Sequence, residues 1–278
     1  MWVAPSHDLS RAQQITSGNL PMVEVAYGAD GRVLSASIDS KLWIMNSDGS
    51  EPTLLADDAG WLTPCGRIVV FASYKGGTVT LTRVNADGSD ATKLISGDLW
   101  KPLKTSLSTR SPACSPDGKF VFYLNAGHPQ KICRIPVEGG TPIQIADVLG
   151  DMMAGRLSIS PAGNLLAYLY EQNNATITPG WKLAVIPVGE GPTVKVFEVP
   201  GGIVGPRWSP DGKGLQYLLT RDRTTNIWEQ PLAGGQPRQL TRFTSGQIFD
   251  FNWSSDHTRL LMTRGTESSD VLLLSNLR

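Results

Sequence analysis

The hydrophobic residues of this chain fall in short runs separated by polar, glycine-rich turns. Examples are RIVVFAS at 67–73, KFVFYL at 119–124 and NLLAYLY at 164–170. These runs are apolar at consecutive positions, which is typical of a strand covered on both faces. The pattern predicts many short β-strands and no long helix.

One turn motif precedes these runs repeatedly. SPDGK occurs at 115–119 and 209–213, and related copies, GADGR, TPCGR, SPAGN and SSDHT, begin at residues 28, 63, 160 and 254. In such a turn Pro presets φ, Asp tolerates the bridge region and Gly takes the left-handed conformation, so the motif predicts a hairpin. The copies recur at intervals of about 35 to 52 residues, which indicates a structural repeat.

Each repeat contains further strand-like segments. A second apolar run such as LWIMN at 42–46 or ICRIP at 132–136 leads into a glycine-containing turn and a short outer segment such as TLL or IQI. The pattern therefore predicts that each repeat is a four-stranded antiparallel meander. Radial repetition of such sheets predicts an all-β, six-bladed β-propeller in a single domain.

The two ends of the chain are expected to share one blade. The last repeat has apolar segments at 248–253, 258–263 and 270–276, and RAQQITSG at 11–18 would supply its outer strand. The predicted blades are approximately 19–59, 60–98, 99–149, 150–202, 203–246, and 247–278 together with 1–18. The segment MWVAP at 1–5 is left over, and we expect it to remain from a blade of a longer parent protein, with a seventh, incomplete blade as the alternative.

Two segments carry a resemblance to a known family. WSPDGK at 208–213 and NIWEQPLAGGQPRQLT at 226–241 resemble the repeat of TolB-like propellers, also called WD40-like Pro-Asp repeats, and the resemblance covers nearly the whole chain. Cys65 and Ala162 replace the Asp of the motif and His257 replaces its Gly. Distorted turns are expected at these three positions.

The resemblance also suggests a setting. WKLAVIPV at 181–188 and SSDVLLLSNLR at 268–278 are similar to propellers fused to bacterial serine/threonine kinases or winged-helix regulators. This similarity implies an extracytoplasmic or periplasmic sensing or docking module. The sequence itself shows no kinase motif and no signal peptide, so any targeting segment would lie outside this chain.

The charge balance and the cysteine content argue against several classes of protein, namely nucleic-acid-binding, disulfide-rich and zinc-binding proteins. Lys plus Arg and Asp plus Glu both number 25, so no basic excess favours nucleic acid. No apolar run is long enough to span a membrane. Three cysteines without C-x-x-C spacing argue against a disulfide framework and a zinc site, and they are predicted to be small buried hydrophobes.

Catalytic and cofactor-binding residues are not predicted. There is no G-x-S-x-G motif, and His7, His128 and His257 lie in expected loops and turns. The alternative is a lactonase-type hydrolase with a calcium ion in the channel, or the gating propeller of a peptidase. The acidic residues considered for such a metal are Asp57, Asp58, Asp151 and Asp250.

The tryptophans separate into packing and surface candidates. Trp43 and Trp228 share one repeat position and Trp208 and Trp253 share another, which predicts packing within blades. Irregular connections carry other candidates for a partner-binding face, since loops on a rigid scaffold often carry recognition. These candidates are Trp100, Lys101, Lys104, Arg110, Asn173 and Trp181. The sequence thus predicts a monomeric, non-catalytic module that binds a protein or small ligand at a rim or channel mouth.

Overall fold

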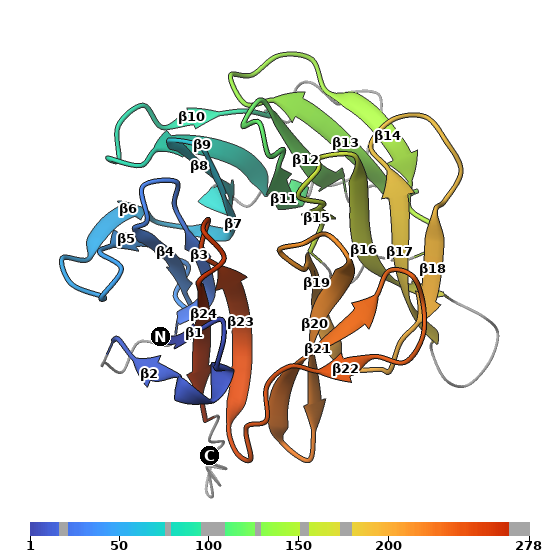
Figure 1. The fold of residues 1–278 in the computed structure, drawn as a ribbon. Coiled ribbons are helices and arrows are strands. Elements are labelled where there is room, and N and C mark those ends of the chain that lie inside the picture. Colours follow the sequence, from blue (N-terminus) through green and yellow to red (C-terminus); the bar gives the residue numbers. More distant parts are fainter. Residues whose placement is uncertain are drawn as a thin grey trace, which may run out of the picture.

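The computed structural model describes residues 1–16, 22–75, 79–95, 109–125, 129–150, 156–172 and 180–266. These residues form six sheets of four antiparallel strands, and the sheets are arranged radially around a central channel (Figure 1). The predicted all-β, six-bladed propeller is therefore confirmed. Within the described residues, no helix is long and apolar enough to cross a membrane.

Each blade begins with an inner strand beside the channel and ends with an outer strand. Blades 1 and 2 comprise β3 (Met22–Tyr27), β4 (Val33–Ser37), β5 (Leu42–Met45), β6 (Thr53–Ala56), β7 (Ala59–Cys65), β8 (Ile68–Ser73), β9 (Thr80–Asn85) and β10 (Thr92–Lys93). Blades 3 and 4 comprise β11 (Thr109–Cys114), β12 (Phe120–Asn125), β13 (Lys131–Pro136), β14 (Ile143–Asp147), β15 (Ser158–Ile159), β16 (Leu165–Gln172), β17 (Gly180–Pro187) and β18 (Lys195–Glu198). Blade 5 comprises β19 (Ile203–Trp208), β20 (Gly214–Arg221), β21 (Thr224–Pro231) and β22 (Arg238–Gln239).

Blade 6 combines strands from the two ends of the chain. Its order is β23 (Gln247–Trp253), β24 (Arg259–Gly265), β1 (Trp2–Pro5) and β2 (Gln13–Gln14). β1 pairs antiparallel with β24, with Trp2 opposite Met262. The prediction that MWVAP remains from another blade was therefore wrong, because this segment is the third strand of blade 6. The segment 270–276, which we expected in that place, lies outside the described residues.

The motif turns are held by their own side chains. In blade 3, the Ser115 hydroxyl donates to Asp117 Oδ1 at 2.6 Å and accepts from the backbone N–H of Phe120 at 2.9 Å, while Asp117 also accepts from Lys119 N at 3.1 Å. The hydrogen bonds from Ser115 and Lys119 lower the pKa of Asp117. Blade 5 repeats this arrangement with Ser209 and Asp211. We call the end of the propeller that carries these turns the motif rim.

Two of the three irregular motif copies keep the turn. In blade 4, where Ala162 replaces the Asp, Ser160 donates instead to Oδ1 of Asn164, the fifth residue of the motif, at 3.0 Å. In blade 6, His257 adopts the left-handed φ of 58° and its backbone N–H reaches Ser254 O at 2.9 Å. Only blade 2 departs, because Cys65 pairs with Ile68 and leaves a two-residue turn. The expected distortion is therefore found in blade 2 alone.

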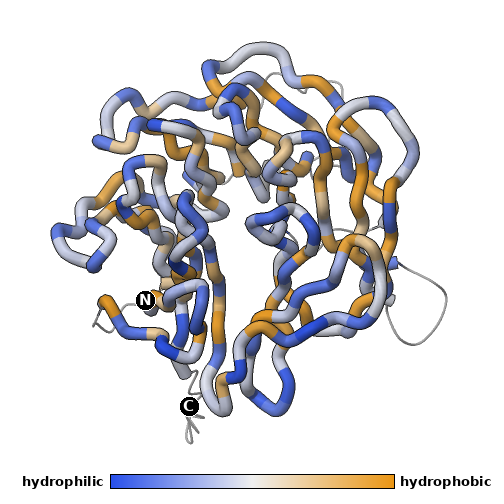
Figure 2. The backbone as a smooth tube through the Cα atoms, in the orientation of Figure 1, coloured by the Kyte–Doolittle hydropathy of each residue, from blue (hydrophilic) through white to orange (hydrophobic). Residues whose placement is uncertain are grey.

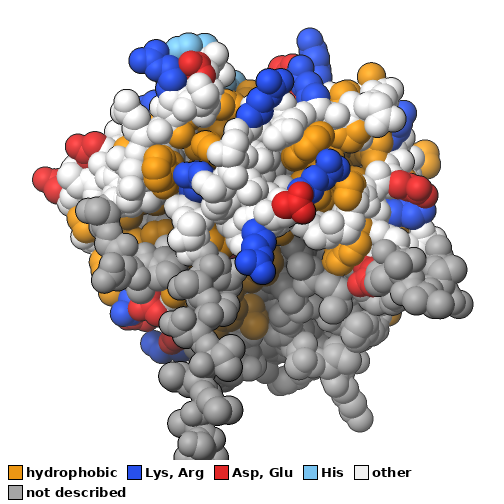
Figure 3. Space-filling view, turned by 90° about the horizontal axis from the view of Figure 1, so that it is seen from below, with side chains coloured by type: hydrophobic (Ala, Val, Ile, Leu, Met, Phe, Trp, Pro, Cys, Tyr) orange, Lys and Arg blue, Asp and Glu red, His pale blue; other side chains and the backbone are white. Residues whose placement is uncertain are grey.

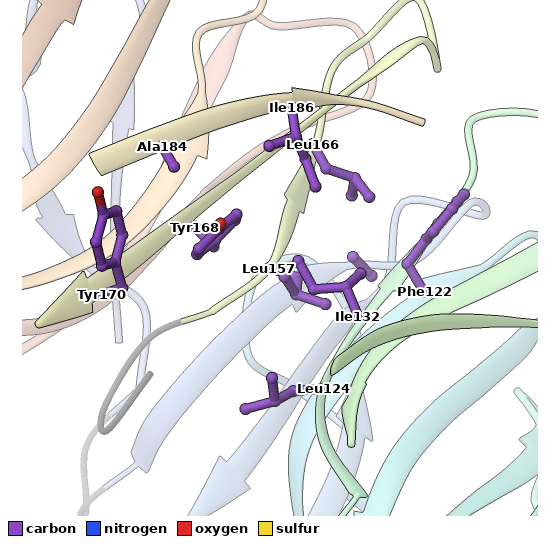
Figure 4. Packing of buried hydrophobic residues seen from close by; sticks show 10 residues of the cluster. Phe122, Leu124, Ile132, Leu157, Leu166, Tyr168, Tyr170, Ala184 and Ile186 are labelled. Carbon is purple, nitrogen blue, oxygen red and sulfur yellow. The ribbon is translucent and has the colours of Figure 1, made fainter. Parts of the chain in front are cut away.

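The hydrophobic core lies between neighbouring blades. In blade 3, Phe122 and Leu124 pack toward blade 4, where they contact a cluster that includes Tyr168 (Figure 4). Val121 and Tyr123, which alternate with them along β12, join a cluster with residues of blade 2. Both faces of the strand are thus buried, which explains the consecutive apolar positions. Figure 2 shows the resulting pattern of hydrophobic strands and hydrophilic turns.

A disulfide links two neighbouring blades. Cys65 at the end of β7 and Cys114 at the end of β11 are bonded, with their Cα atoms 5.4 Å apart. The prediction of three unpaired cysteines was wrong for this pair, because their separation of 49 residues in sequence becomes contact only when blades 2 and 3 stack. Cys133 is free and buried, as predicted.

Candidate functional site: the channel and its mouth

The inner strands are irregular where they line the channel. β3, β7, β11, β19 and β23 each show a register shift against the second strand of the blade. Trp61, Ser111 and Gly205 at these shifts adopt positive φ angles of 53°, 58° and 87°. A β-bulge leaves backbone groups outside the strand ladder and redirects side chains. The channel wall therefore needs hydrogen-bond partners from elsewhere.

Glu24 of blade 1 accepts hydrogen bonds from the backbone N–H groups that the bulge of blade 2 leaves outside the strand ladder. Its Oε1 accepts from Trp61 N at 2.9 Å, and its Oε2 accepts from Leu62 N at 2.9 Å. Two adjacent backbone donors thus hold one carboxylate. This arrangement ties the inner strands β3 and β7 together.

Asp250 of blade 6 has a buried side chain that is 7% exposed. Its Oδ1 accepts from Arg207 Nη2 at 2.9 Å, and its Oδ2 accepts from Arg156 Nη2 at 3.1 Å and from Val25 N at 3.0 Å. Arg156 Nη2 also lies 3.1 Å from Glu24 Oε2. We refer to Glu24, Arg156, Arg207 and Asp250 as the channel network. It spans the channel between blades 1, 4, 5 and 6.

Burial and ion pairing shift the pKa values of these groups in opposite directions. Burial alone would raise the pKa of Asp250, but the adjacent Arg156 and Arg207 outweigh it, and the pKa is lowered. Burial tends to lower the pKa of Arg156, but Asp250 and Glu24 outweigh it, and the pKa is raised. For Arg207, burial and the nearby Arg156 prevail over Asp250, and the pKa is lowered. Arginine nevertheless stays charged in proteins, so the network joins ionised groups.

The channel network also explains which signal in the sequence was missed. Glu24, Arg156 and Asp250 each stand four residues before the first residue of their turn motif, Gly28, Ser160 and Ser254. The other three repeats carry Ala59, Ser111 and Gly205 at this place, so the recurrence of a charge in half of the repeats could have been recognised. Of the residues of the channel network, only Asp250 was predicted to have a role, as a candidate metal ligand.

At the motif rim, a cavity of about 280 Å³ lies along blades 4, 5 and 6 and reaches Arg207 of the channel network. The prolines of the motif turns form part of its wall, and Pro116 of blade 3 packs on Gly163 of blade 4, where an added Cβ would lie 3.3 Å from the proline ring. Trp208 is fixed by two hydrogen bonds to Ser158, through its backbone N and its indole Nε1. The lining residues are Pro116, Ser158, Ile159, Ser160, Pro161, Arg207, Trp208, Ser209, Pro210, Asn252, Trp253, Ser254, Ser255 and His257. This mouth offers aromatic, apolar and hydrogen-bonding groups to a ligand.

The acidic residues considered for a channel metal do not converge. Asp57 and Asp58 are exposed in the turn between β6 and β7, whereas Asp250 is buried and paired with arginines. Asp151 lies outside the described residues. Among the residues described, no group of three or more His, Cys, Asp or Glu side chains could hold a metal ion.

Of the predicted partner-binding residues, the structure describes few. Trp100, Lys101, Lys104 and Asn173 lie outside the described residues. Arg110 belongs to β11, where it pairs with Leu124 through the backbone, and its side chain is not described. Trp181 is partly buried against the cluster of Leu169 and Tyr217 between blades 4 and 5. A shared face formed by these residues remains a prediction.

Comparisons with known proteins agree with this architecture. No family model matches the chain. A segment of 66 residues, 23% of the chain, is 39% identical to the Tol-Pal system protein TolB of Marinomonas sp. (strain MWYL1), and the match spans 15% of that protein.

Several solved structures share the fold at low sequence identity. A putative TolB from Agrobacterium tumefaciens has a TM-score of 0.69 and 15% identity, with 96% of this chain and 98% of that chain covered. A gluconolactonase from Xanthomonas campestris has a TM-score of 0.64 and 15% identity, with 90% and 85% covered. A puromycin-hydrolyzing peptidase from Mycobacterium tuberculosis has a TM-score of 0.60 and 18% identity, with 88% and 44% covered. Its repeat motif, its six blades and these matches show that the chain has a six-bladed β-propeller fold that is similar to that of TolB.

Proposed function

We propose that this chain is a non-catalytic interaction module that binds a segment of a protein partner at the mouth on the motif rim. The channel network is the observation that carries this proposal. Glu24 and Asp250, the carboxylates that meet in the channel, are already held by guanidinium groups and backbone N–H groups. They serve to hold the ring of blades together.

This arrangement weighs against a calcium-dependent lactonase. Calcium needs six to eight oxygen ligands, commonly including carboxylates. A cation here would have to displace Arg156 and Arg207 from Asp250, and it would then face two uncompensated guanidinium charges. The network therefore favours a structural role for the channel acids and leaves binding to the mouth.

The mouth has the chemistry of a protein-binding surface. Trp253 is partly exposed in its wall together with the rigid prolines of three motif turns, whereas Trp208 is 6% exposed and supports the wall from within. Aromatic side chains are enriched among the residues that dominate binding energy at interfaces. A cavity of about 280 Å³ suits a few inserted side chains.

We further propose that the module works outside the cytoplasm, in the periplasm of a bacterium, as part of a larger protein. The resemblance to TolB supports this location. The disulfide between Cys65 and Cys114 supports it independently, because such bonds persist in oxidising compartments. The fusion to a kinase or winged-helix regulator suggested by the sequence remains a proposal.

A site-specific crosslinking experiment tests the mouth. A photoreactive residue at Ser255, which is exposed in the mouth wall, is compared with one at Glu190, which is exposed on an outer turn of blade 4. In intact cells, we expect a discrete protein adduct from position 255 and none from position 190. Equal adducts at both positions would contradict the proposed site.

An enzymatic assay tests the alternative suggested by the lactonase and peptidase folds. The purified chain is incubated with a panel of lactones, with and without calcium, and we expect no turnover. Calcium-dependent hydrolysis that is lost in the Asp250→Asn variant would overturn the non-catalytic proposal and favour a lactonase.

A further inference from the structure

The rim opposite the motif turns carries a second candidate site, at the junction of blades 5 and 6. Three segments meet there: the β20–β21 hairpin, the connection 242–246 and the end of β24. Thr225 N donates to Gly246 O at 3.1 Å, and Asn226 Nδ2 donates to Phe243 O at 3.1 Å. These bonds fix the hairpin against the connection and make one continuous surface.

Arg264 occupies the centre of this junction. Its guanidinium carbon lies 4.4 Å from the centre of the Phe243 ring and 5.3 Å from that of Trp2. Nη2 donates to Ser245 O at 2.7 Å, while Nε is buried and has no hydrogen-bond partner. Within the described residues, no carboxylate forms an ion pair with Arg264. A guanidinium has five N–H donors in a planar fork that matches a carboxylate, so this one has donors to spare.

A cavity of about 300 Å³ lies beside this guanidinium. It is lined by Trp2, Gln14, Ser245, Gly246, Arg264, Gly265 and Thr266, and we call it the Arg264 pocket. Phe249 does not line the pocket but lies next to its wall, because a Cβ added to Gly265 would lie 3.8 Å from the Phe249 ring. Phe249 is 37% exposed, and Val204 on the adjacent inner strand is 46% exposed. An apolar surface thus adjoins a charged pocket.

The surroundings of the pocket are basic although the chain has no net charge. Arg221, Arg223 and Arg242 are exposed on the same segments, and the guanidinium of Arg221 stacks 5.0 Å from the Trp228 ring centre. Among residues 221–224, 242–246 and 263–266, which lie at this junction, Asp222 is the one acidic side chain. Figure 3, which views the molecule from below Figure 1, shows Lys and Arg side chains among hydrophobic patches on the side of the propeller that is seen there.

From this charge and shape, we propose that the Arg264 pocket docks an acidic segment of a protein partner. One carboxylate of the segment enters the pocket and pairs with Arg264, and an apolar side chain of the same segment covers Phe249. The neighbouring arginines attract further acidic residues. This surface is separate from the mouth on the motif rim, so a partner could engage either one without the other.

A labelled peptide containing glutamate and phenylalanine is the probe, and its binding to the whole chain is followed by fluorescence anisotropy. We expect affinity to fall at least tenfold in the Arg264→Gln variant and severalfold in Phe249→Ser. Lys119→Gln, which removes a charge on the motif rim, is the matched control and should leave the affinity unchanged. Binding should also weaken as salt increases, because charge attraction is screened.

A second variant keeps the proposal testable if Arg264→Gln fails to fold. Ser245→Glu keeps the arginine but places a carboxylate at the pocket, and we expect it to block the peptide. Binding that is unchanged in Arg264→Gln or Ser245→Glu would overturn the proposal. So would Arg264-dependent binding to phosphatidylglycerol vesicles without peptide binding, since that result would assign a lipid surface. None of these outcomes affects crosslinking at Ser255, which tests the mouth separately.

Discussion

Arg156 Nη2 lies 3.1 Å from Glu24 Oε2, and these residues come from blades 4 and 1, which face each other across the channel. The same nitrogen lies 3.1 Å from Asp250 Oδ2 of blade 6. One guanidinium therefore connects three blades, two of which lie on opposite sides of the channel. This cross-connection makes the channel network a determinant of ring stability, and its contribution can be measured.

Replacing Arg156 with Met should destabilise the fold strongly. The side chains of Arg156 and Glu24 are only 16% and 14% exposed, so the substitution would leave a largely buried carboxylate without its cation. We expect a loss of about 3 kcal/mol in the free energy of unfolding, measured by urea denaturation. The control is Lys182→Met, which removes an ion pair whose Glu198 is 88% exposed and should cost less than about 1 kcal/mol. Similar losses for both variants would contradict this role of the channel.

The stability contribution of Asp250 should depend on pH in a defined direction. Its pKa is lowered in the folded protein, so the ionised form is favoured by folding. That contribution is fully present above the unfolded pKa of about 4 and is lost as the pH falls through the lower folded pKa. Urea denaturation of the wild type and of Asp250→Asn should therefore show a stability difference that is constant near neutrality and shrinks in acid. A difference that grows with acidification would have the wrong sign.

Reduction of the disulfide should weaken the propeller. The bond between Cys65 and Cys114 closes a loop with a sequence separation of 49 residues, for which chain entropy in the unfolded state gives about 4 kcal/mol. We expect a lower melting temperature under reducing conditions and in the Cys65→Ala, Cys114→Ala double variant. Cys133→Ala serves as the control, because it removes the free thiol but should keep the response to reductant. Absence of that response in the wild type would show that the bond does not form.

Comparing Gly118→Ala with Gly163→Ala should distinguish the stability lost through backbone strain from the stability lost through a steric contact between blades. Gly118 and Gly163 have φ angles of 72° and 74°, so an alanine at either place adopts a strained left-handed conformation that costs about 1 kcal/mol. A Cβ at Gly118 meets nothing within 4 Å, whereas one at Gly163 lies 3.3 Å from Pro116 Cδ of the preceding blade. Gly163→Ala should therefore lower the free energy of unfolding more than Gly118→Ala. Equal losses in chemical denaturation would mean that the turns do not interlock.

The match between sequence and structure differs from element to element. The turn at 209–213 was predictable, because Ser209, Asp211 and the adjoining N–H groups bond to one another within five residues. The role of Trp2–Pro5 was not predictable from the sequence. Two short apolar segments, 1–5 and 270–276, one at each end of the chain, both suited the third strand of blade 6. Only the pairing of Trp2–Pro5 with Met262 and its neighbours on β24 decides between them. The disulfide was not predicted either, because Cys65 and Cys114 belong to different blades and come together only when the blades stack.

The candidate site shows the same division. Trp208 and Trp253 were expected to serve blade packing; each packs in a cluster with the preceding blade, and both line the mouth. Arg264 was not predicted as a site residue, because a single arginine at the end of a strand forms no recognisable sequence motif. Its place between Trp2 and Phe243 depends on residues more than 200 positions apart that blade 6 brings together.

The sequence by itself determined the repeat, the hairpin turns, the doubly covered strands and hence a six-bladed all-β ring. These features depend on hydrogen bonds and burial patterns that each segment carries locally. The tertiary structure decided which strand closes blade 6, which cysteines bond and which charges meet in the channel. Those relationships depend on distances between blades, which are fixed only when the ring closes and burial requires each charge to find a partner.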